Sequence, residues 1–188
     1  DLWYSVSDAT PGEGMTVSRV AIVTGAARGI GALVARGLSA AGHAVSLVGL
    51  EGDLLRQNAR SLGDRALAFE ADVTDRVAIG NAFEATRERF GSIDIVVSNA
   101  GIATWGLLRS MPQAHFRRII AVNVEGTFNA IQASLPHLVE SRGYFLGVAS
   151  VAAAVAPPGL AAYGTSKAAT ESLCNTFRAE VSHLDRKS

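Results

Sequence analysis

Short apolar runs alternate with longer segments whose apolar residues recur at helical spacing, and this alternation repeats five times along the chain. The short runs are rich in β-branched residues and hold few polar positions, which is typical of strands buried on both faces of a sheet. We expect strands at residues 20–24, 44–48, 66–70, 93–97 and 144–149. Parallel strands need crossovers of a dozen or more residues, and the spacing between these runs permits them.

The intervening segments predict helices, several of which stop at a glycine that tolerates a left-handed cap. We expect helices over residues 30–41, 53–62, 75–90, 112–138 and 161–181. In the longest, apolar residues step by three or four from Phe116 to Leu138 and form one continuous face. Pro136 lies near its end, where proline kinks or closes a helix. The pattern predicts an α/β fold, a doubly wound parallel sheet with helices on both faces.

Length and charge narrow the possible function classes. The chain has 188 residues, which suits a single globular domain. Its 17 basic and 17 acidic side chains balance, and no block of like charges stands out, so we expect neither nucleic acid nor a membrane as a partner. No run of about 18 apolar residues occurs, so a transmembrane helix is not expected.

Cysteine and histidine usage argues against metal and disulfide chemistry. Cys174 is the only cysteine, so an intramolecular disulfide is impossible and a thiolate zinc cluster is not expected. The four histidines show no metal-ligand spacing, and we interpret them as surface or helix-end residues. A reducing, cytoplasmic compartment is the simplest interpretation. Residues 1–16 show no period and predict a flexible extension ahead of a domain over residues 17–188.

Three glycines follow the first expected strand, at the point where the first helix begins. Gly25 permits a tight turn, Gly29 lets a ligand approach the backbone, and Gly31 lets the helix pack against the strand. The helix start then offers free N–H groups and a positive dipole end to a pyrophosphate. The spacing Gly-x-x-x-Gly-x-Gly departs from the standard dinucleotide fingerprint, and a merely structural glycine turn is the alternative.

Tyr163 and Lys167 are four residues apart on an expected helix, so both side chains can point into one cleft. A neighbouring ammonium stabilises a phenolate and fits a tyrosine for proton transfer at neutral pH. Ser150 closes the fifth expected strand, the end at which open α/β sheets bind ligands, and it can donate a hydrogen bond to a reacting oxygen. Taken singly, such residues usually belong to a solvated helix face or a turn.

Together these features occur in a recognisable order. Residues 24–31 read Thr-Gly-x-x-x-Gly-Ile-Gly, and residues 98–101 read Ser-Asn-Ala-Gly. Ser150 is followed thirteen residues later by Tyr163, the first residue of a Tyr-x-x-x-Lys motif. From about residue 17 to residue 183 the chain resembles the short-chain dehydrogenase/reductase family.

The resemblance implies a Rossmann-type fold and an enzyme that interconverts a secondary alcohol and a ketone by hydride transfer with NAD(P). Tyr163 would be the general acid or base, and Lys167 would also hold the nicotinamide ribose. Asn123, within the longest helix, would anchor a water in a proton relay. The catalytic candidates are therefore Asn123, Ser150, Tyr163 and Lys167.

The resemblance also implies which residues bind the cofactor. Asp72 and Val73 would hold the adenine ring. Gly49 stands where NAD-preferring relatives carry an aspartate. The absence of that carboxylate removes a repulsion against a 2′-phosphate, and Arg28 could pair with the phosphate. The whole expected set is Gly25, Arg28, Gly29, Ile30, Gly31, Gly49, Leu50, Asp72, Val73, Asn99, Ala100, Gly101, Tyr163 and Lys167.

The choice between the two dinucleotides stays open in the sequence. Leu50 stands where NADP-preferring relatives often carry a basic residue, and Glu51 could bind a ribose hydroxyl instead. Taken together, these features slightly favour NADP over NAD as the cofactor. The resemblance implies a small alcohol or carbonyl compound as the substrate, and we expect residues 152–160 and those after Gly101, which are small and apolar, to line its pocket.

The chain departs from the family in its length. Relatives continue with a further strand, a substrate loop, a helix and a last strand, so the C-terminal part of the fold is apparently missing here. A non-catalytic or truncated dinucleotide-binding protein is therefore the alternative. The epimerase branch and the enoyl reductases are disfavoured, because their glycine or tyrosine–lysine spacings differ. Smaller departures are Ser98 and Gly147, where asparagine is frequent. The resemblance also implies a homodimer or homotetramer that pairs through the two long helices.

Overall fold

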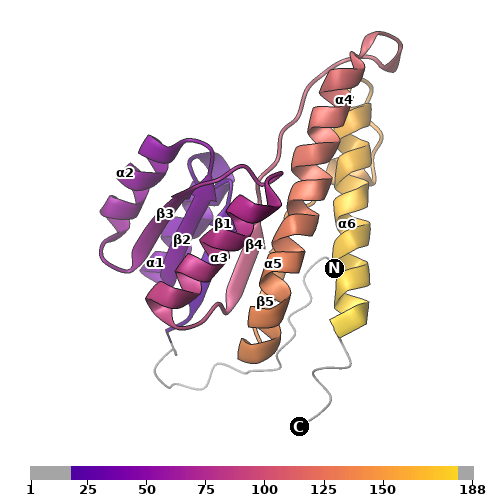
Figure 1. The fold of residues 1–188 in the computed structure, drawn as a ribbon. Helices are drawn as coiled ribbons and strands as arrows, with labels where there is room; N and C mark the ends of the chain where they lie inside the picture. The colour runs from indigo at the N-terminus through magenta and orange to yellow at the C-terminus, as the bar shows by residue number, and fades with distance from the viewer. Residues whose placement is uncertain (1–17, 182–188) are drawn as a thin grey trace.

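The computed structural model describes residues 18–181, which form a five-stranded parallel sheet with helices on both faces (Figure 1). The strands are β1 (Val20–Thr24), β2 (Ala44–Gly49), β3 (Ala66–Glu70), β4 (Ile95–Ser98) and β5 (Tyr144–Gly147). Their spatial order is β3-β2-β1-β4-β5, so the order reverses at β1, as in a doubly wound sheet. The predicted Rossmann-type α/β fold class is confirmed. The expected extension over residues 1–16, with its boundary, lies outside the described residues.

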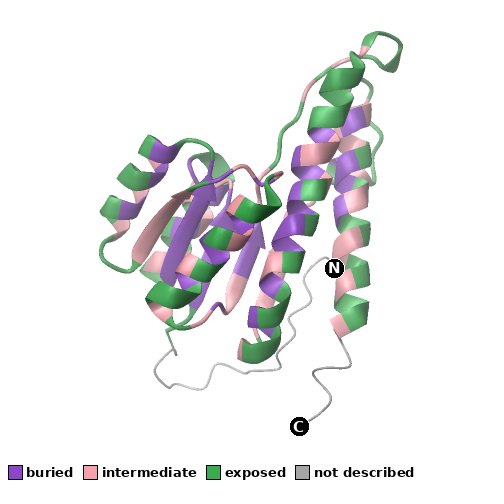
Figure 2. Cartoon of the chain, in the orientation of Figure 1, coloured by how far each residue is buried: buried purple, intermediate pink, exposed green. Residues whose placement is uncertain are grey.

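Alternate residues of the central strands enter two different cores. Val23 of β1 packs with α1 (Gly29–Ala40) and α2 (Gly52–Leu62), whereas its neighbour Ile22 packs with α3 (Arg76–Phe90) on the opposite face. Successive side chains of a strand point to opposite faces, so a strand that is apolar throughout needs cover on both sides. Figure 2 shows β1 and β2 buried along their whole length, which is why their sequences read as continuous apolar runs.

The helix predicted after Pro112 is one rod with an irregular turn inside it. It runs from α4 (Gln113–Ile120) through a π turn (Ala121–Glu125) into α5 (Gly126–Ser141). The rod lies beside α6 (Ala161–Val181), whose bounds agree with the sequence prediction (Figure 1). A π turn adds one residue to a helical turn and often marks a functional position. Here it places Asn123 on the buried side of the rod.

The apolar face predicted for this rod is only partly buried. Phe128 is 45% exposed and Leu135 is 37% exposed. The buried side carries smaller residues, among them Gly126, whose Cβ position would lie 2.6 Å from a methyl carbon of Val73. Small residues let a helix approach its neighbours closely, so size as well as hydrophobicity selects the buried face. Pro136 lies inside α5 and does not close it.

One histidine also differs from the expectation. His137 was expected at the surface or at a helix end, but it is only 8% exposed, and its Nε2 lies 3.4 Å from Oε1 of Glu84 on α3. The imidazole is thus part of the contact between α3 and α5. Over residues 18–181, the helices all lack either the length or the apolar character that a membrane crossing requires.

Candidate active site

The loop between β1 and α1 has the shape of a phosphate cradle. Gly25 and Gly29 adopt positive φ angles of 65° and 58°, which favour glycine. A Cβ at Gly31 would overlap the Gly25 carbonyl oxygen, whereas a Cβ at Gly29 would meet no atom within 4 Å. Arg28, at the N-cap of α1, makes no side-chain hydrogen bond to the helix. The tight packing behind the loop and the open space in front of it fit a ligand that approaches the helix N-terminus.

Three side chains hold this loop in place. Asn99 donates from Nδ2 to the carbonyl oxygens of Thr24 (3.1 Å) and Gly25 (3.3 Å). The Thr24 hydroxyl oxygen accepts the backbone N–H groups of Asn99 (3.0 Å) and Ala100 (3.1 Å), which ties the end of β1 to the end of β4. Asn58 on α2 donates to the Ala27 carbonyl oxygen at 2.8 Å. The glycine loop is therefore braced from two sides before any ligand arrives.

Tyr163 and Lys167 lie together on the first turns of α6. The Lys167 ammonium nitrogen is 5.8 Å from the centre of the Tyr163 ring and donates to the Val148 carbonyl oxygen at 2.7 Å. Lys167 is 5% exposed, and this burial lowers the pKa of its ammonium, while the charge interaction with Cys174 acts in the opposite direction. The hydrogen bond to Val148, the residue after β5, thus fixes a buried cation beside the tyrosine.

Asn123 connects the π turn to two other segments. It is 1% exposed, and its side-chain amide pairs with the backbone of Ile102, accepting the N–H at 2.8 Å and donating to the carbonyl at 2.9 Å. Its Nδ2 also donates to the Ser166 hydroxyl at 2.9 Å, and Ser166 donates in turn to the Tyr163 carbonyl oxygen at 2.7 Å. Asn123 therefore links the loop after β4 to the turn of α6 that carries Tyr163.

The backbone carbonyl of Asn123 is engaged as well. It accepts the hydroxyls of Thr127 at 2.8 Å and of Thr170 at 3.1 Å. Ser98, at the end of β4, donates to the Thr127 hydroxyl at 3.3 Å. The serine that departs from the family motif is thus part of the network around the π turn.

Ser150 lies at the start of a short 3₁₀ helix (Val151–Ala153, η3). Its hydroxyl oxygen accepts the Ala152 N–H at 3.2 Å and caps that helix. Gly164 packs against the same segment, because its Cβ position would lie 2.8 Å from the Ala152 carbonyl oxygen. The segment that follows Ser150 is therefore pressed against the turn of α6 that carries Tyr163.

Gly101 lies between two of the catalytic candidates. Its Cβ position would be 3.3 Å from Asn123 Oδ1 and 3.4 Å from Lys167 Nζ. The structure therefore brings Asn123, Lys167 and the Asn-Ala-Gly loop after β4 close together.

The expected adenine site lies after β3. Asp72 accepts the Thr74 N–H at 2.9 Å and the Thr74 hydroxyl at 2.8 Å, and its other oxygen lies 3.1 Å from Nη2 of Arg118. Burial raises the pKa of Asp72, but these hydrogen bonds and the arginine outweigh it and hold the pKa below its usual value. Val73 is buried, and its carbonyl oxygen accepts Nδ2 of Asn129 at 2.9 Å. Asp72 is thus a fixed, ionised carboxylate.

The remaining expected cofactor residues lie at the ends of β1 and β2. Gly49 is buried as the last residue of β2, whereas Leu50 is 56% exposed. Ile30, in the first turn of α1, is 64% exposed. The Arg28 guanidinium forms an ion pair with Glu51, with Nη2 2.6 Å from Oε1.

The chain matches the family model described as short chain dehydrogenase over residues 19–184. The chain belongs to this family. It is 42% identical over 161 residues to 2-(R)-hydroxypropyl-CoM dehydrogenase of Xanthobacter autotrophicus, a match that covers 81% of this chain and 64% of that protein. It is 32% identical over 172 residues to a 3-oxoacyl-[acyl-carrier-protein] reductase of Staphylococcus aureus, covering 89% of this chain and 70% of that protein.

A solved structure of an alcohol dehydrogenase has a similar fold. It is an alcohol dehydrogenase from the archaeon Thermococcus sibiricus complexed with 5-hydroxy-NADP, and it superposes with a TM-score of 0.84 at 31% identity. The superposition covers 87% of this chain and 71% of that chain. The predicted family and the expectation of an NAD(P) cofactor are supported by these relatives. The chain spans just under two thirds, 64%, of the Xanthobacter dehydrogenase.

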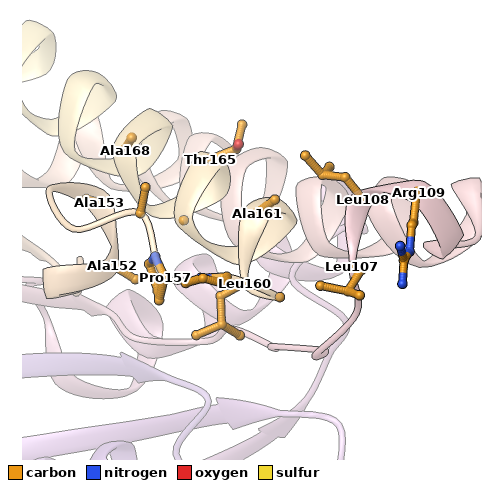
Figure 3. A pocket seen from close by; sticks show the side chains of 14 residues that line it. Leu107, Leu108, Arg109, Ala152, Ala153, Pro157, Leu160, Ala161, Thr165 and Ala168 are labelled. Carbon is orange, nitrogen blue, oxygen red and sulfur yellow. The ribbon is translucent and has the colours of Figure 1, made fainter.

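A cavity of about 770 Å³ lies beside the first turns of α6 (Figure 3). The two segments expected to line a substrate pocket both contribute to it, and its walls are Leu107, Leu108, Arg109, Ala152, Ala153, Ala156, Pro157, Pro158, Gly159, Leu160, Ala161, Gly164, Thr165 and Ala168. Among the residues that the structure describes, the four catalytic candidates do not line this cavity. At 3.6 residues per turn, Thr165 and Ala168 project from α6 well away from Tyr163 and Lys167. Thr165 and Ala168 therefore line the cavity from a side of α6 that differs from the side carrying Tyr163 and Lys167.

Several residues that contact the candidate site were not predicted from the sequence. Thr24 falls within the glycine motif, so its position at the strand end was a usable signal. Asn58, Arg118 and Ser166 gave none, because they come from helices whose approach to the site depends on the packing of the whole sheet. Gly147, noted as a departure, is explained by the fold, since a Cβ there would overlap the Cys174 sulfur.

Proposed function

We propose that this protein is an NAD(P)-dependent oxidoreductase that interconverts a secondary alcohol and a ketone by hydride transfer. The observation that carries the proposal is the buried Lys167 ammonium, held by the Val148 carbonyl 5.8 Å from the Tyr163 ring. On a solvated helix face such a lysine would stay in water, because moving a cation out of water costs free energy that only suitable partners offset. Membership of the short-chain dehydrogenase family supports the same reaction class.

Tyr163 is the proposed general acid in carbonyl reduction and the general base in alcohol oxidation. In the reductive direction its O–H donates a proton to the carbonyl oxygen, and the nearby ammonium of Lys167 stabilises the phenolate that remains. Ser150, three residues after β5, would donate a hydrogen bond to the same oxygen as negative charge develops on it. A nicotinamide dinucleotide, when bound, supplies the hydride acceptor or donor.

The cofactor would be held by the loops at the carboxyl edge of the sheet. The N–H groups at the start of α1 would receive the pyrophosphate, with Gly29 leaving room for its approach. Asp72 and Val73 would hold the adenine ring, and Lys167 the nicotinamide ribose. Asn123 acts here as a positioning residue, because its amide fixes the backbone of Ile102 and the Ser166 hydroxyl.

We also propose a substrate class, an oligomeric state and a location for this protein. The substrate would be a small alcohol or carbonyl compound, and neither nucleic acid nor a membrane would be a partner. Phe128 and Leu135, exposed on α5, and Val139, 45% exposed on the same helix, supply an apolar surface for a homodimer or homotetramer. A cytoplasmic location is supported by the single cysteine in the sequence.

Two measurements on the same protein test the proposal. The absorbance of reduced nicotinamide is followed over a panel of ketones and secondary alcohols, and calorimetry measures the binding of NAD and NADP. We expect both binding and turnover. Binding without turnover across the panel would favour the alternative, a non-catalytic dinucleotide-binding protein. Absence of binding to either dinucleotide would contradict both.

A further inference from the structure

Two opposite charges meet where the glycine loop faces the end of β2. Arg28 Nη2 lies 2.6 Å from Glu51 Oε1, and the side chains are 72% and 45% exposed. Arg28 precedes the first residue of α1, while Glu51 follows β2 by two residues and takes the N-cap position of α2. Glu51 makes no side-chain hydrogen bond to α2, so its carboxylate is directed at the arginine rather than used as a helix cap.

The neighbouring charges at this corner are also committed. Arg56 Nη2 lies 2.7 Å from Asp53 Oδ1, and Arg56 Nη1 lies 3.7 Å from Glu70 Oε2. A Cβ at Gly52 would overlap the Glu70 carboxylate, so glycine at that position lets the carboxylate come close. Within residues 18–181, the ion pairs at this corner therefore join two arginines to three carboxylates, so each of these arginines already has a carboxylate partner.

The position of this corner gives it a chemical meaning. In open α/β sheets, the adenosine ribose of a dinucleotide lies past the strand that follows the glycine loop and its helix. An acidic side chain there binds the ribose 2′-hydroxyl, and an arginine accommodates a 2′-phosphate. This chain holds one residue of each kind, Glu51 and Arg28, and the two are paired with each other.

We propose that Glu51 is a specificity-determining residue that occupies Arg28 and thereby weakens the binding of NADP relative to NAD. This inference rests on the proposed function, because it concerns the cofactor of that same site. A 2′-phosphate has to take the Arg28 guanidinium from Glu51 and then lie near the released carboxylate. A 2′-hydroxyl donates a hydrogen bond to Glu51 and leaves the ion pair intact.

Calorimetric titration of the whole chain with NAD and with NADP tests the proposal. In Glu51→Gln, which keeps the shape and removes the charge, we expect the Kd for NADP to fall by about fivefold, the upper range for an exposed ion pair. The Kd for NAD should change by less than about twofold or rise. Asp53→Asn is the matched control, because it removes a charge from the same corner that pairs with Arg56 instead. It should leave the NADP-to-NAD affinity ratio near that of the wild type.

A second pair of variants shows whether Glu51 acts through Arg28. In Arg28→Gln the Kd for NADP should rise, and adding Glu51→Gln to that background should produce little further change. A gain for NADP that persists in the Arg28→Gln background would overturn the proposal, because it would show general repulsion rather than competition for the arginine. An equal gain in Asp53→Asn would overturn it as well.

The outcome also separates this inference from the proposed function. Wild-type protein that binds neither dinucleotide contradicts the proposed function, and this inference with it. Wild-type protein that binds both dinucleotides, with an affinity ratio that Glu51→Gln leaves unchanged, overturns only the role of Glu51. Raising the ionic strength should narrow the difference in the Kd for NADP between Glu51→Gln and the wild type, because salt screens exposed ion pairs.

Discussion

Adding one methyl group at Gly31 tests whether the glycine loop is shaped by close packing. A Cβ there would overlap the Gly25 carbonyl oxygen and would lie 2.6 Å from Asn99 Nδ2. Both neighbours are fixed, Gly25 by its turn and Asn99 by its hydrogen bonds to β1, so α1 itself has to move. Overpacking of this kind typically costs about 1–3 kcal/mol. For a chain of this size each kcal/mol lowers Tm by about 2–4 °C.

Gly31→Ala should also weaken dinucleotide binding, because a shifted α1 no longer presents its N–H groups in the same place. Gly37→Ala on the same helix is the matched control. Gly37 is exposed, and its Cβ position meets no atom within 4 Å, so the alanine should stabilise the protein by about 0.5–1 kcal/mol. Urea unfolding and calorimetric titration measure the two effects. Wild-type stability together with wild-type affinity in Gly31→Ala would refute the packing argument.

Three further results are expected from the region around α6. Burial lowers the pKa of Lys167 from its ordinary 10.5, so the unfolded chain holds this proton more firmly than the folded one. As the pH rises towards 10.5, the free energy of unfolding of the wild type, measured in urea, should therefore increase relative to that of Lys167→Met. Burial raises the pKa of the Cys174 thiol, so iodoacetamide should label it at least about tenfold more slowly in the native protein than in urea. Gly147→Ala should cost about 1–3 kcal/mol through overlap with the Cys174 sulfur, and Cys174→Ala should recover most of that loss. The first statement would be contradicted by a stability difference between wild type and Lys167→Met that does not depend on pH, and the second by equal labelling rates in the native protein and in urea. Additive effects of Gly147→Ala and Cys174→Ala would contradict the third.

The strands and most helices could be predicted because their patterns are local. A strand buried on both faces is apolar throughout, as in β1, and glycines mark several helix ends, as Gly91 does after α3. The glycine loop and the Tyr163–Lys167 spacing are likewise written in consecutive residues. These features predict Tyr163 and Lys167 on one helix and the glycine loop at the junction of β1 and α1, where the structure has them.

The interior of the long rod could not be predicted, because its buried face depends on what it packs against. The π turn at Asn123 has no sequence signal of its own, and it is held by contacts to Ile102 and Thr170, which are distant in the chain. The exposure of Phe128 follows from the close approach that Gly126 permits. Hydrophobic periodicity records apolar residues but not which of them a neighbouring helix has room to cover.

The ion pair between Arg28 and Glu51 shows the same limit at the cofactor site. Each residue could be assigned from the sequence to one of two dinucleotides, and the assignments opposed each other. Only the fold shows that the two side chains meet. Their competition is a tertiary property, because one comes from the loop after β1 and the other from the loop after β2.

The central claim is that Tyr163 transfers the proton in a dinucleotide-dependent reaction. The most direct test is the kcat of Tyr163→Phe with the best substrate found for the wild type, measured beside the calorimetric Kd for the dinucleotide. Removing one hydroxyl should lower kcat by about a hundredfold to ten-thousandfold, because the general acid and base is lost. The Kd should stay within about twofold of the wild-type value, because the glycine loop is untouched. A kcat in the variant close to that of the wild type would contradict the account.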